Sequence, residues 1–382
     1  MTGTPAPSPL EAEERWARAA ISELVEPANG TIRQLLADQG GVATLQAIRH
    51  RAAGSDRDLY VRVPELDVDR IAGDVQKARA RVVLPGDAEW PLGLDALEHP
   101  PYCLYVRGDR RLDDLAERSV AVVGARACSA YGQRVAAELG EGLASRGWVV
   151  ISGAAFGVDA AAHRGALAAG GDTVAVLACG VDRSYPQAHE RLLGQVLEQG
   201  LVVSEVPPRA VPFPGRFLAR NRIIAALARA TVVVEASLRS GSLSTAGEAR
   251  RVHRPVGAVP GPVTSATSAG THQLVREDGA VLVTDVADVL DLAAPIGEAT
   301  APRRTGRTRA TDSLTEAERR VWAAAPLRRW ADLDRLAVGA GVDQAAVTRA
   351  VVVLEMLGLL EGDGHRWRKA RGSVQGSAPG GL

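Results

Sequence analysis

Short apolar runs and helical repeats alternate through the middle of this chain. Each apolar run stops at or near a Gly or Ser, and a stretch with helical spacing of its apolar residues follows. The pattern predicts strands near 119–124, 147–152, 173–178, 200–204, 231–236, 255–259 and 280–284. Strands separated by helices form parallel sheets, so we predict an α/β fold with a parallel sheet in residues 81–295. Such sheets bind ligands at the carboxyl ends of their strands, where helix N-termini suit phosphate.

The residues before the sheet have a helical pattern. Apolar positions recur at helix spacing through 11–80, which predicts a small helical domain in residues 1–80, SAM-like or helix-hairpin-helix-like. Residues 82–118 are rich in loop-forming residues and contain one predicted strand, at 103–108.

The residues after the sheet predict a second compact domain. Residues 296–312 are rich in Pro, Thr, Gly and Arg, which is typical of a flexible linker. Residues 313–372 show three helical patterns followed by a strand, an Asp-Gly turn and a strand, which predicts a winged helix. We expect residues 373–382 to be a disordered tail.

Composition limits the classes of function. No apolar run reaches the ~20 residues of a membrane-spanning helix, so we expect no membrane partner. The three cysteines are far apart, without metal-ligand spacing, which favours a reducing cytoplasm and no metal site. Lys and Arg balance Asp and Glu at 45 each, yet residues 216–254 hold eight Arg against two acids. A local basic field of this kind attracts anions even in a neutral protein.

Nucleotide cofactors are disfavoured by the loops that follow the strands. After the first strand the chain has Gly124 followed by Ala125, without the G-x-G-x-x-G of dinucleotide sites. The second strand ends at Ser152 and Gly153, where an acidic residue would hold a ribose, and the chain has no Walker sequence. We therefore expect a phosphate-binding edge without a cofactor.

Three loops at the predicted edge carry candidate ligand contacts. Arg126 lies just beyond the first strand, and strand-end loops are where binding residues concentrate. The glycines of these loops allow close backbone approach to a ligand; they are Gly124, Gly153, Gly157 and Gly180. Asp159 and His163 are four residues apart on a helix, but they lack a third ligand and a nucleophile, so a structural role is favoured.

The segment 212–228 combines arginines with aromatic residues. Arg216, Arg220 and Arg222 crowd the start of a predicted helix, where cations oppose the helix dipole, so we expect an anion there. Phe213 and Phe217 lie among these arginines. Arginines that hold phosphates and rings that stack on bases are typical of single-strand binding, although core packing is an alternative for each Phe.

A loop of small residues follows the fifth predicted strand. Ser240, Gly241 and Ser242 offer hydroxyls and bare N–H groups at the start of another helix. This pattern predicts a second phosphate cradle, with helix capping by a serine as the alternative.

These motifs together resemble the DNA-processing protein A family (DprA, also called Smf). The similarity covers 82–293 densely and the two flanking segments more loosely. It rests on a lead-in at 85–108 and on seven ordered motifs, at 124–126, 152–163, 179–186, 204–205, 220–228, 232–249 and 259–270. Two positions depart from the family pattern, His272 in place of Asn and Trp90 in place of Tyr.

The resemblance implies an extended Rossmann-like fold for residues 81–295. It further implies a protein that binds single-stranded DNA and loads the recombinase RecA onto it in natural transformation. It also implies single-strand-binding protein as a further partner, a homodimer, and no catalysis. Within the family pattern the DNA pocket uses the first-strand arginine, the R-N-R element and the small-residue loop. In this chain these are Arg126, Arg220, Asn221, Arg222, Ser240, Gly241 and Ser242. Arg216 stands where the family often has Lys or His.

Two other functions remain open at this stage. A related Rossmann-like group cleaves nucleoside monophosphates, and Glu248 is the one acid here in a comparable position. A regulator of transcription would instead use the C-terminal domain on duplex DNA, with Arg349 and the basic run 365–369 on phosphates.

Overall fold

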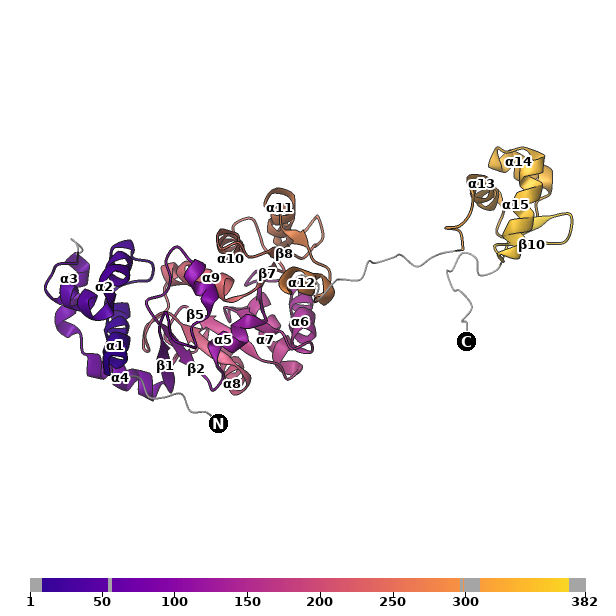
Figure 1. Cartoon of the computed structure of the whole chain (residues 1–382). Coiled ribbons are helices and arrows are strands. Elements are labelled where there is room, and N and C mark those ends of the chain that lie inside the picture. The colour runs from indigo at the N-terminus through magenta and orange to yellow at the C-terminus, as the bar shows by residue number, and fades with distance from the viewer. Residues whose placement is uncertain (1–8, 54–56, 296–297, 299–309, 371–382) are drawn as a thin grey trace. The chain divides into compact units, whose positions relative to one another are not determined.

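The computed structural model describes residues 9–53, 57–295, 298 and 310–370. The chain divides into two compact units, Met1–Ala301 and Pro302–Leu382 (Figure 1). The first unit contains a nine-stranded sheet with helices on both faces, and a group of helices that precedes it in the chain.

The sheet runs in the order β1-β2-β6-β5-β4-β3-β7-β8-β9. Pairing is parallel from β6 through to β9 and antiparallel for β1 with β2 and for β2 with β6. The strands are β1 (Ala80–Val83), β2 (Leu104–Arg107), β3 (Ser119–Val123), β4 (Val149–Ser152), β5 (Thr173–Leu177), β6 (Leu201–Ser204), β7 (Ala230–Val233), β8 (Val256–Ala258) and β9 (Val281–Leu282). All seven strands predicted after residue 118 are present. The sequence pattern missed β1, because its four residues merge with the loop that follows.

Helices cover both faces of the parallel strands, which explains why those strands are almost wholly apolar. In β3, Val120 and Val122 pack with the cluster that includes α6 and α7, whereas Ala121 and Val123 pack with α9. The helices of this part are α5 (Leu112–Glu117), α6 (Ala130–Ala144), α7 (Val158–Ala168), α8 (Glu190–Gln199), α9 (Pro214–Leu227), α10 (Gly241–Arg251), α11 (Ala269–Glu277) and α12 (Val286–Ala293).

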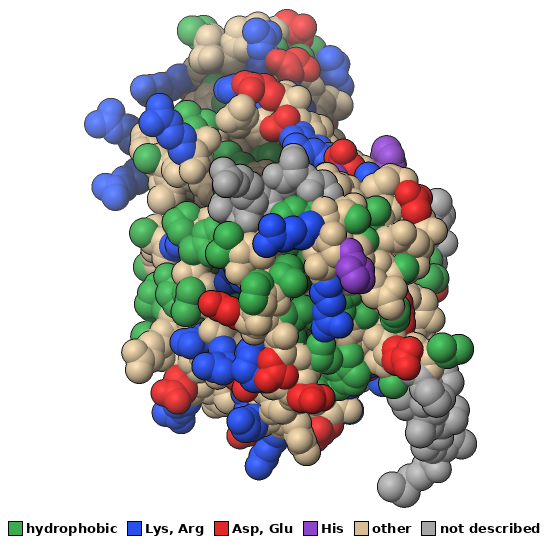
Figure 2. Space-filling model, turned by 90° about the vertical axis from the view of Figure 1, so that its left-hand side faces the viewer, with side chains coloured by type: hydrophobic (Ala, Val, Ile, Leu, Met, Phe, Trp, Pro, Cys, Tyr) green, Lys and Arg blue, Asp and Glu red, His purple; other side chains and the backbone are tan. Residues whose placement is uncertain are grey.

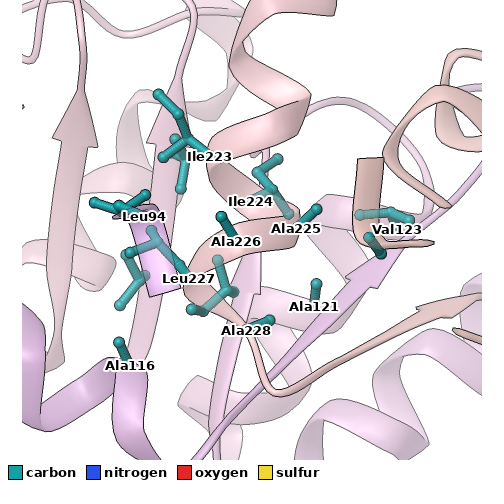
Figure 3. Packing of buried hydrophobic residues seen from close by; sticks show 14 of the residues in the cluster. Leu94, Ala116, Ala121, Val123, Ile223, Ile224, Ala225, Ala226, Leu227 and Ala228 are labelled. Atoms are coloured by element: carbon teal, nitrogen blue, oxygen red, sulfur yellow. The ribbon is translucent and has the colours of Figure 1, made fainter. Parts of the chain in front are cut away.

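The apolar side of α9 fixes this helix in the core. Ile223, Ile224 and Leu227 are almost fully buried and belong to one cluster with Leu94 and Val123 (Figure 3). Burial of each such side chain contributes about 1.5–3 kcal/mol. The arginines of α9 are therefore carried by a helix that cannot shift without disturbing the core.

The N-terminal helices are α1 (Pro9–Leu24), α2 (Gly30–Arg49), α3 (Arg57–Arg62) and α4 (Val68–Lys77). The helical pattern at 11–80 is confirmed. A break inside α2 lies at Gly40, whose φ of 78° leaves the helical region. Glu14 of α1 accepts hydrogen bonds from the freed N–H groups of Gly41 and Val42. These bonds and the one from Arg18 outweigh burial and lower the pKa of Glu14.

The second unit has its own small core. Its helices are α13 (Glu316–Ala324), α14 (Leu333–Ala340) and α15 (Gln344–Met356), and its antiparallel strands are β10 (Leu360–Gly362) and β11 (Trp367–Lys369). This is the order of elements that the sequence predicted, and the assignment to the winged-helix class stays a prediction. The predicted linker and tail lie mostly outside the described residues. Within the described residues no single helix has the length and apolarity to cross a membrane; α14 and α15 pass that test only as a bent pair.

Candidate functional site

The carboxyl ends of β3, β4, β5 and β7 meet at one edge of the sheet, and the start of α9 lies against it. The loops are joined by their backbones, since Ala125 N–H donates to Glu235 O at 2.7 Å and Gly180 N–H donates to Ala210 O at 3.0 Å. Gly124 packs against Val158 at the start of α7. The structure therefore brings together the loops on which the predicted site residues lie.

Aromatic side chains are exposed at this edge. The chain has only three Phe, and all lie here, with Phe156 49% exposed, Phe213 39% exposed and Phe217 partly buried. Tyr185 is 41% exposed, and its ring lies 5.5 Å from that of Phe217. Large exposed rings cost apolar burial, so a cluster of them marks a binding surface. We define the outer rim as Arg126, Phe156, Tyr185, Phe213 and Phe217.

Arg126 is the exposed cation of the outer rim. Its guanidinium carbon lies 4.8 Å from the centre of the Phe217 ring, which is cation–π distance. Within residues 9–53, 57–295 and 310–370 no carboxylate pairs with it. Its charge is therefore available to an anion that approaches over the ring.

Arg216 has a different environment. Its guanidinium lies over Phe213 at 4.7 Å and binds the Glu26 carboxylate of the N-terminal helices with two hydrogen bonds, of 2.6 and 2.9 Å. The Arg216 side chain is only 14% exposed, whereas that of Glu26 is 46% exposed. The anion that the sequence predicts near this arginine is supplied by the protein itself, through a contact 190 residues apart in the chain.

Arg220 is buried beneath the outer rim. It donates to the carbonyl of Gly153 at 2.9 Å and to the carbonyl of Val176. Burial lowers the pKa of Arg220 to about 10, while the charge of Asp159 opposes that shift. A Cβ at Gly153 would stand 2.5 Å from the guanidinium, so this glycine makes room for the arginine. At Gly157, which has a φ of 80°, a Cβ would stand 2.3 Å from the carbonyl oxygen of Ala125.

Arg222 and Glu205 form a buried ion pair. The guanidinium donates to both carboxylate oxygens at 2.5 and 2.6 Å, and the two side chains are 8% and 6% exposed. Burial raises the pKa of Glu205, although the charge of Arg222 opposes this. The side chain of Arg222 is thus directed at the loop after β6 and away from the outer rim.

The remaining acids of this edge also have protein partners. Asp159 is buried and accepts hydrogen bonds from the N–H groups of Gly153 and Ala155 at 3.1 and 3.3 Å. His163 is buried against Thr173 at 2.7 Å, and burial lowers its pKa to about 3. The described residues contain no group of His, Cys, Asp and Glu able to hold a metal ion. We define the buried charged layer as Asp159, Glu205, Arg220 and Arg222.

The small-residue loop begins α10. Ser240 is the N-cap and accepts a bond from Ser242 N–H at 3.4 Å, and the two hydroxyls lie 2.7 Å apart. Asn221 donates to Gly241 O at 3.2 Å, which ties the loop to α9. The alternative role of this loop, in which Ser240 caps the helix, is therefore seen directly in the structure. The space around Gly241 is open, so a ligand has room to approach the loop.

Sequence reasoning missed several groups at this edge. Tyr185, Arg183 and Arg239 are exposed on strand-end loops, and their position after strands was the available signal. Glu26 carried no signal, because nothing in its local sequence points to Arg216. Glu248, the acid of the hydrolase alternative, pairs with Arg251 one turn along α10.

The comparisons with known proteins agree with one another. The family model described as DNA recombination-mediator protein A matches residues 81–294. A relative in Mycobacterium tuberculosis, which carries the name putative DNA processing protein DprA, is 43% identical over 95% of this chain and 96% of its own length. The protein Smf of Escherichia coli is 43% identical over 55% of this chain and 56% of its own length.

Two solved structures share the fold. The X-ray structure of DNA processing protein A from Streptococcus pneumoniae is 33% identical, with a TM-score of 0.60, and covers 73% of this chain and 95% of that one. The DNA processing protein A of Helicobacter pylori is 30% identical, with a TM-score of 0.50, over 56% of this chain and 96% of that one. The Helicobacter pylori protein is described as having a unique single-stranded DNA binding mode.

Proposed function

Since this chain belongs to the DNA recombination-mediator protein A family, we propose that it binds single-stranded DNA along the outer rim. The observation that carries the proposal is the exposed pair of Arg126 and Phe217, a guanidinium without a carboxylate partner among the described residues held 4.8 Å from a ring centre. Sequence-tolerant single-strand sites combine cations for phosphates with rings for bases. The single-stranded DNA binding of the Helicobacter pylori protein supports the same ligand class.

The geometry suggests how the strand is held. Arg126 donates to a phosphate, and the base beside that phosphate stacks on Phe217, with Tyr185 next to it. The Ser240–Ser242 loop offers a second place for phosphate at the start of α10. Arg220 and Asn221 act indirectly, because they fix the Gly153 and Gly241 loops that frame the rim. No bond of the strand is broken in this scheme.

The family further suggests what the bound strand is for. We propose that the protein acts in the cytoplasm as a homodimer, protects incoming single strands and loads RecA onto them, with single-strand-binding protein as the competitor. The support for this role is family membership. Filament formation by RecA on coated strands, measured with and without this protein, tests that role.

Substitution of Arg126 tests the binding site itself. We expect Arg126→Ala to weaken binding of an oligothymidylate about 10-fold, as for a lost hydrogen bond to a charged group. The slope of log affinity against log salt should fall by about 0.7, the value for one phosphate contact on a single strand. Oligonucleotide anisotropy across a salt series measures both quantities.

Arg146→Ala is the matched control for that experiment. Arg146 is exposed at the opposite edge of the sheet, and within the described part of the chain its side chain donates a hydrogen bond only to the Gly142 carbonyl, at 2.9 Å. It should change neither quantity. Unchanged affinity and slope for Arg126→Ala would rule out the outer rim as the site.

A further inference from the structure

A basic cavity lies between the N-terminal helices and the loop that leads into α9. Its volume is about 580 Å³. Five arginines line it against two acids, Glu23 and Glu65. The arginines are Arg62, Arg70, Arg183, Arg209 and Arg216. We call this space the inter-domain cavity. Figure 2 shows the side of the molecule that carries the N-terminal helices, where acidic and basic side chains otherwise lie side by side.

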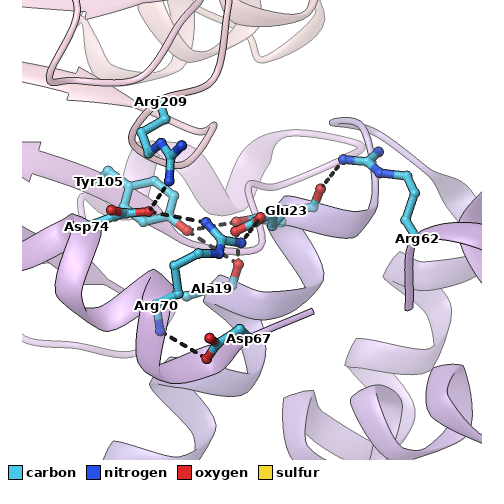
Figure 4. A network of polar contacts seen from close by, with 9 residues as sticks. Ala19, Glu23, Arg62, Asp67, Arg70, Asp74, Tyr105 and Arg209 are labelled. Carbon is cyan, nitrogen blue, oxygen red and sulfur yellow. Dashed lines mark hydrogen bonds and ion pairs between the residues drawn. The ribbon is translucent and has the colours of Figure 1, made fainter. Parts of the chain in front are cut away.

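Three of these arginines are neutralised by carboxylates. Arg70 pairs with Glu23 and with Asp74, and Arg209 reaches the same Asp74 at 3.3 Å (Figure 4). Asp74 is almost buried and binds both Arg70 of α4 and Arg209 of the loop after β6. These three residues therefore join α4 to that loop, and the two arginines form part of the cavity wall. Arg216 is held by Glu26, as described above.

The other two arginines keep their charge. Arg62 donates only to backbone carbonyls, those of Glu23 at 2.6 Å and Leu24 at 3.1 Å. Arg183 donates through Nε to the carbonyl of Arg209 at 3.0 Å. Among the residues that the structure describes, neither has an acidic partner. Both guanidinium groups are oriented by the backbone yet retain donors, which is the condition for anion capture by Arg.

The inter-domain cavity is continuous with the outer rim. Arg216 belongs to the cavity wall and lies over Phe213 of the rim. Arg183 belongs to the wall and is two residues from Tyr185. A strand that leaves the rim past Phe213 or Tyr185 therefore reaches these cations next.

We propose that the inter-domain cavity is a further phosphate subsite, which takes the backbone of the same single strand beyond the outer rim. The inference rests on the proposed function and adds the N-terminal helices to the DNA footprint. Arg62 and Arg183 each donate to a phosphodiester oxygen, and Arg216 joins them when Glu26 is displaced. Because the subsite is reached only past the rim, it contributes only to strands long enough to extend into it.

The test uses the full chain with oligothymidylates from about 4 to about 16 nucleotides, the span of common single-strand sites. For the parent protein we expect affinity to rise with length and then to level off. The double variant Arg62→Ala/Arg183→Ala should match the parent on short strands and bind the longest about 10-fold more weakly. Its salt slope on long strands should be lower by about 1.4, the loss of two phosphate contacts.

Control variants separate this proposal from the one on which it rests. Arg126→Ala should weaken binding at every length, and Arg146→Ala at none. Arg183→Ala alone provides a second variant. Among the described residues the exposed Arg183 side chain has one hydrogen bond, to the Arg209 carbonyl, and its loss leaves α1 untouched.

Two outcomes would overturn the proposal while leaving the rim intact. One is parent-like binding of the longest strands by both cavity variants. The other is capture of a fluorescent oligoglutamate peptide that the double variant loses while its binding to DNA is unchanged, because the cavity would then serve an acidic protein segment.

Discussion

The outer rim and the buried charged layer lie at the same edge of one sheet, yet their charges do different work. In the rim, Arg126 is exposed, lies over a ring and has no carboxylate partner among the described residues. In the layer, Arg222 forms a buried ion pair with Glu205. Arg220 donates hydrogen bonds to two backbone carbonyls and lies close to Asp159. An arginine-rich segment therefore does not by itself mark a ligand surface; the partner of each guanidinium decides its role.

This difference separates two kinds of mutational effect. Loss of a charge from the layer leaves another charge buried without a partner, so it should lower stability. Loss of a rim group removes much less that the fold needs, so it should lower affinity more than stability. Stability and binding measured on the same variants can therefore test the division.

The largest effect is expected at the Arg222–Glu205 pair. Arg222→Ala leaves a carboxylate that is 6% exposed without its cation, and breaking a buried pair in this way costs about 3–5 kcal/mol. Denaturant unfolding of the first unit at neutral pH should show this loss. The loss should shrink as the pH falls, because the pKa of Glu205 is already raised by burial and rises further without Arg222. The folded state of the variant then takes up the proton more readily than the unfolded chain.

The double variant Arg222→Met/Glu205→Leu is the control for that prediction. With both charges replaced by apolar groups of similar size, most of the lost stability should return. If Arg222→Ala unfolds at the same denaturant concentration as the parent, the Arg222–Glu205 pair is accessible to water. The distinction between the buried charged layer and the outer rim would then fail.

Phe217→Ala, in the outer rim, should lower affinity for DNA more than it lowers stability. The ring is partly buried, and stacking of a base on an aromatic side chain contributes about 1–3 kcal/mol. We expect affinity for short oligothymidylates to fall between about 5-fold and about 150-fold, with a smaller change in the unfolding free energy than Arg222→Ala causes. Anisotropy titration and denaturant unfolding on one preparation give both values.

Phe217→Trp tests whether lost stacking on a base explains the weaker binding of Phe217→Ala. It keeps an aromatic face next to Tyr185 and should bind within a few-fold of the parent. Equal losses for the Ala and Trp variants would mean that Phe217 shapes the α9 backbone and does not contact bases.

Much of the fold follows from local sequence, whereas the division of the arginines does not. The strands after residue 118 were predictable because runs such as Val120–Val123 are buried on both faces and therefore apolar. The strand β1 was not, because its burial depends on pairing with β2 and on the N-terminal helices. The edge at which the site lies was predictable, since topology alone brings the strand ends together.

The partner of each arginine depends on contacts between distant segments. Glu205 meets Arg222 and Glu26 meets Arg216 only through the tertiary fold, 17 and 190 residues apart in the chain. From the sequence alone, Arg216, Arg220 and Arg222 cannot be told apart, because all three belong to one helix. Their partners differ because α9 is buried on all sides from Arg220 to its end, so Arg220 and Arg222 point in different directions and meet different buried groups. Arg216 lies in the first turn of the helix and reaches Glu26 instead.

The smallest effect is expected at Glu26, which lies outside both regions and binds Arg216. Its carboxylate binds Arg216 as a phosphate would, so a strand that uses Arg216 must first displace it. Glu26→Gln removes that competition. Because exposed ion pairs contribute about 0.2–1 kcal/mol, affinity should rise by no more than about 5-fold, and most at low salt. The gain should vanish when Arg216→Ala is added. Weaker binding by Glu26→Gln would instead mean that this acid positions Arg216 for the strand and does not compete with it.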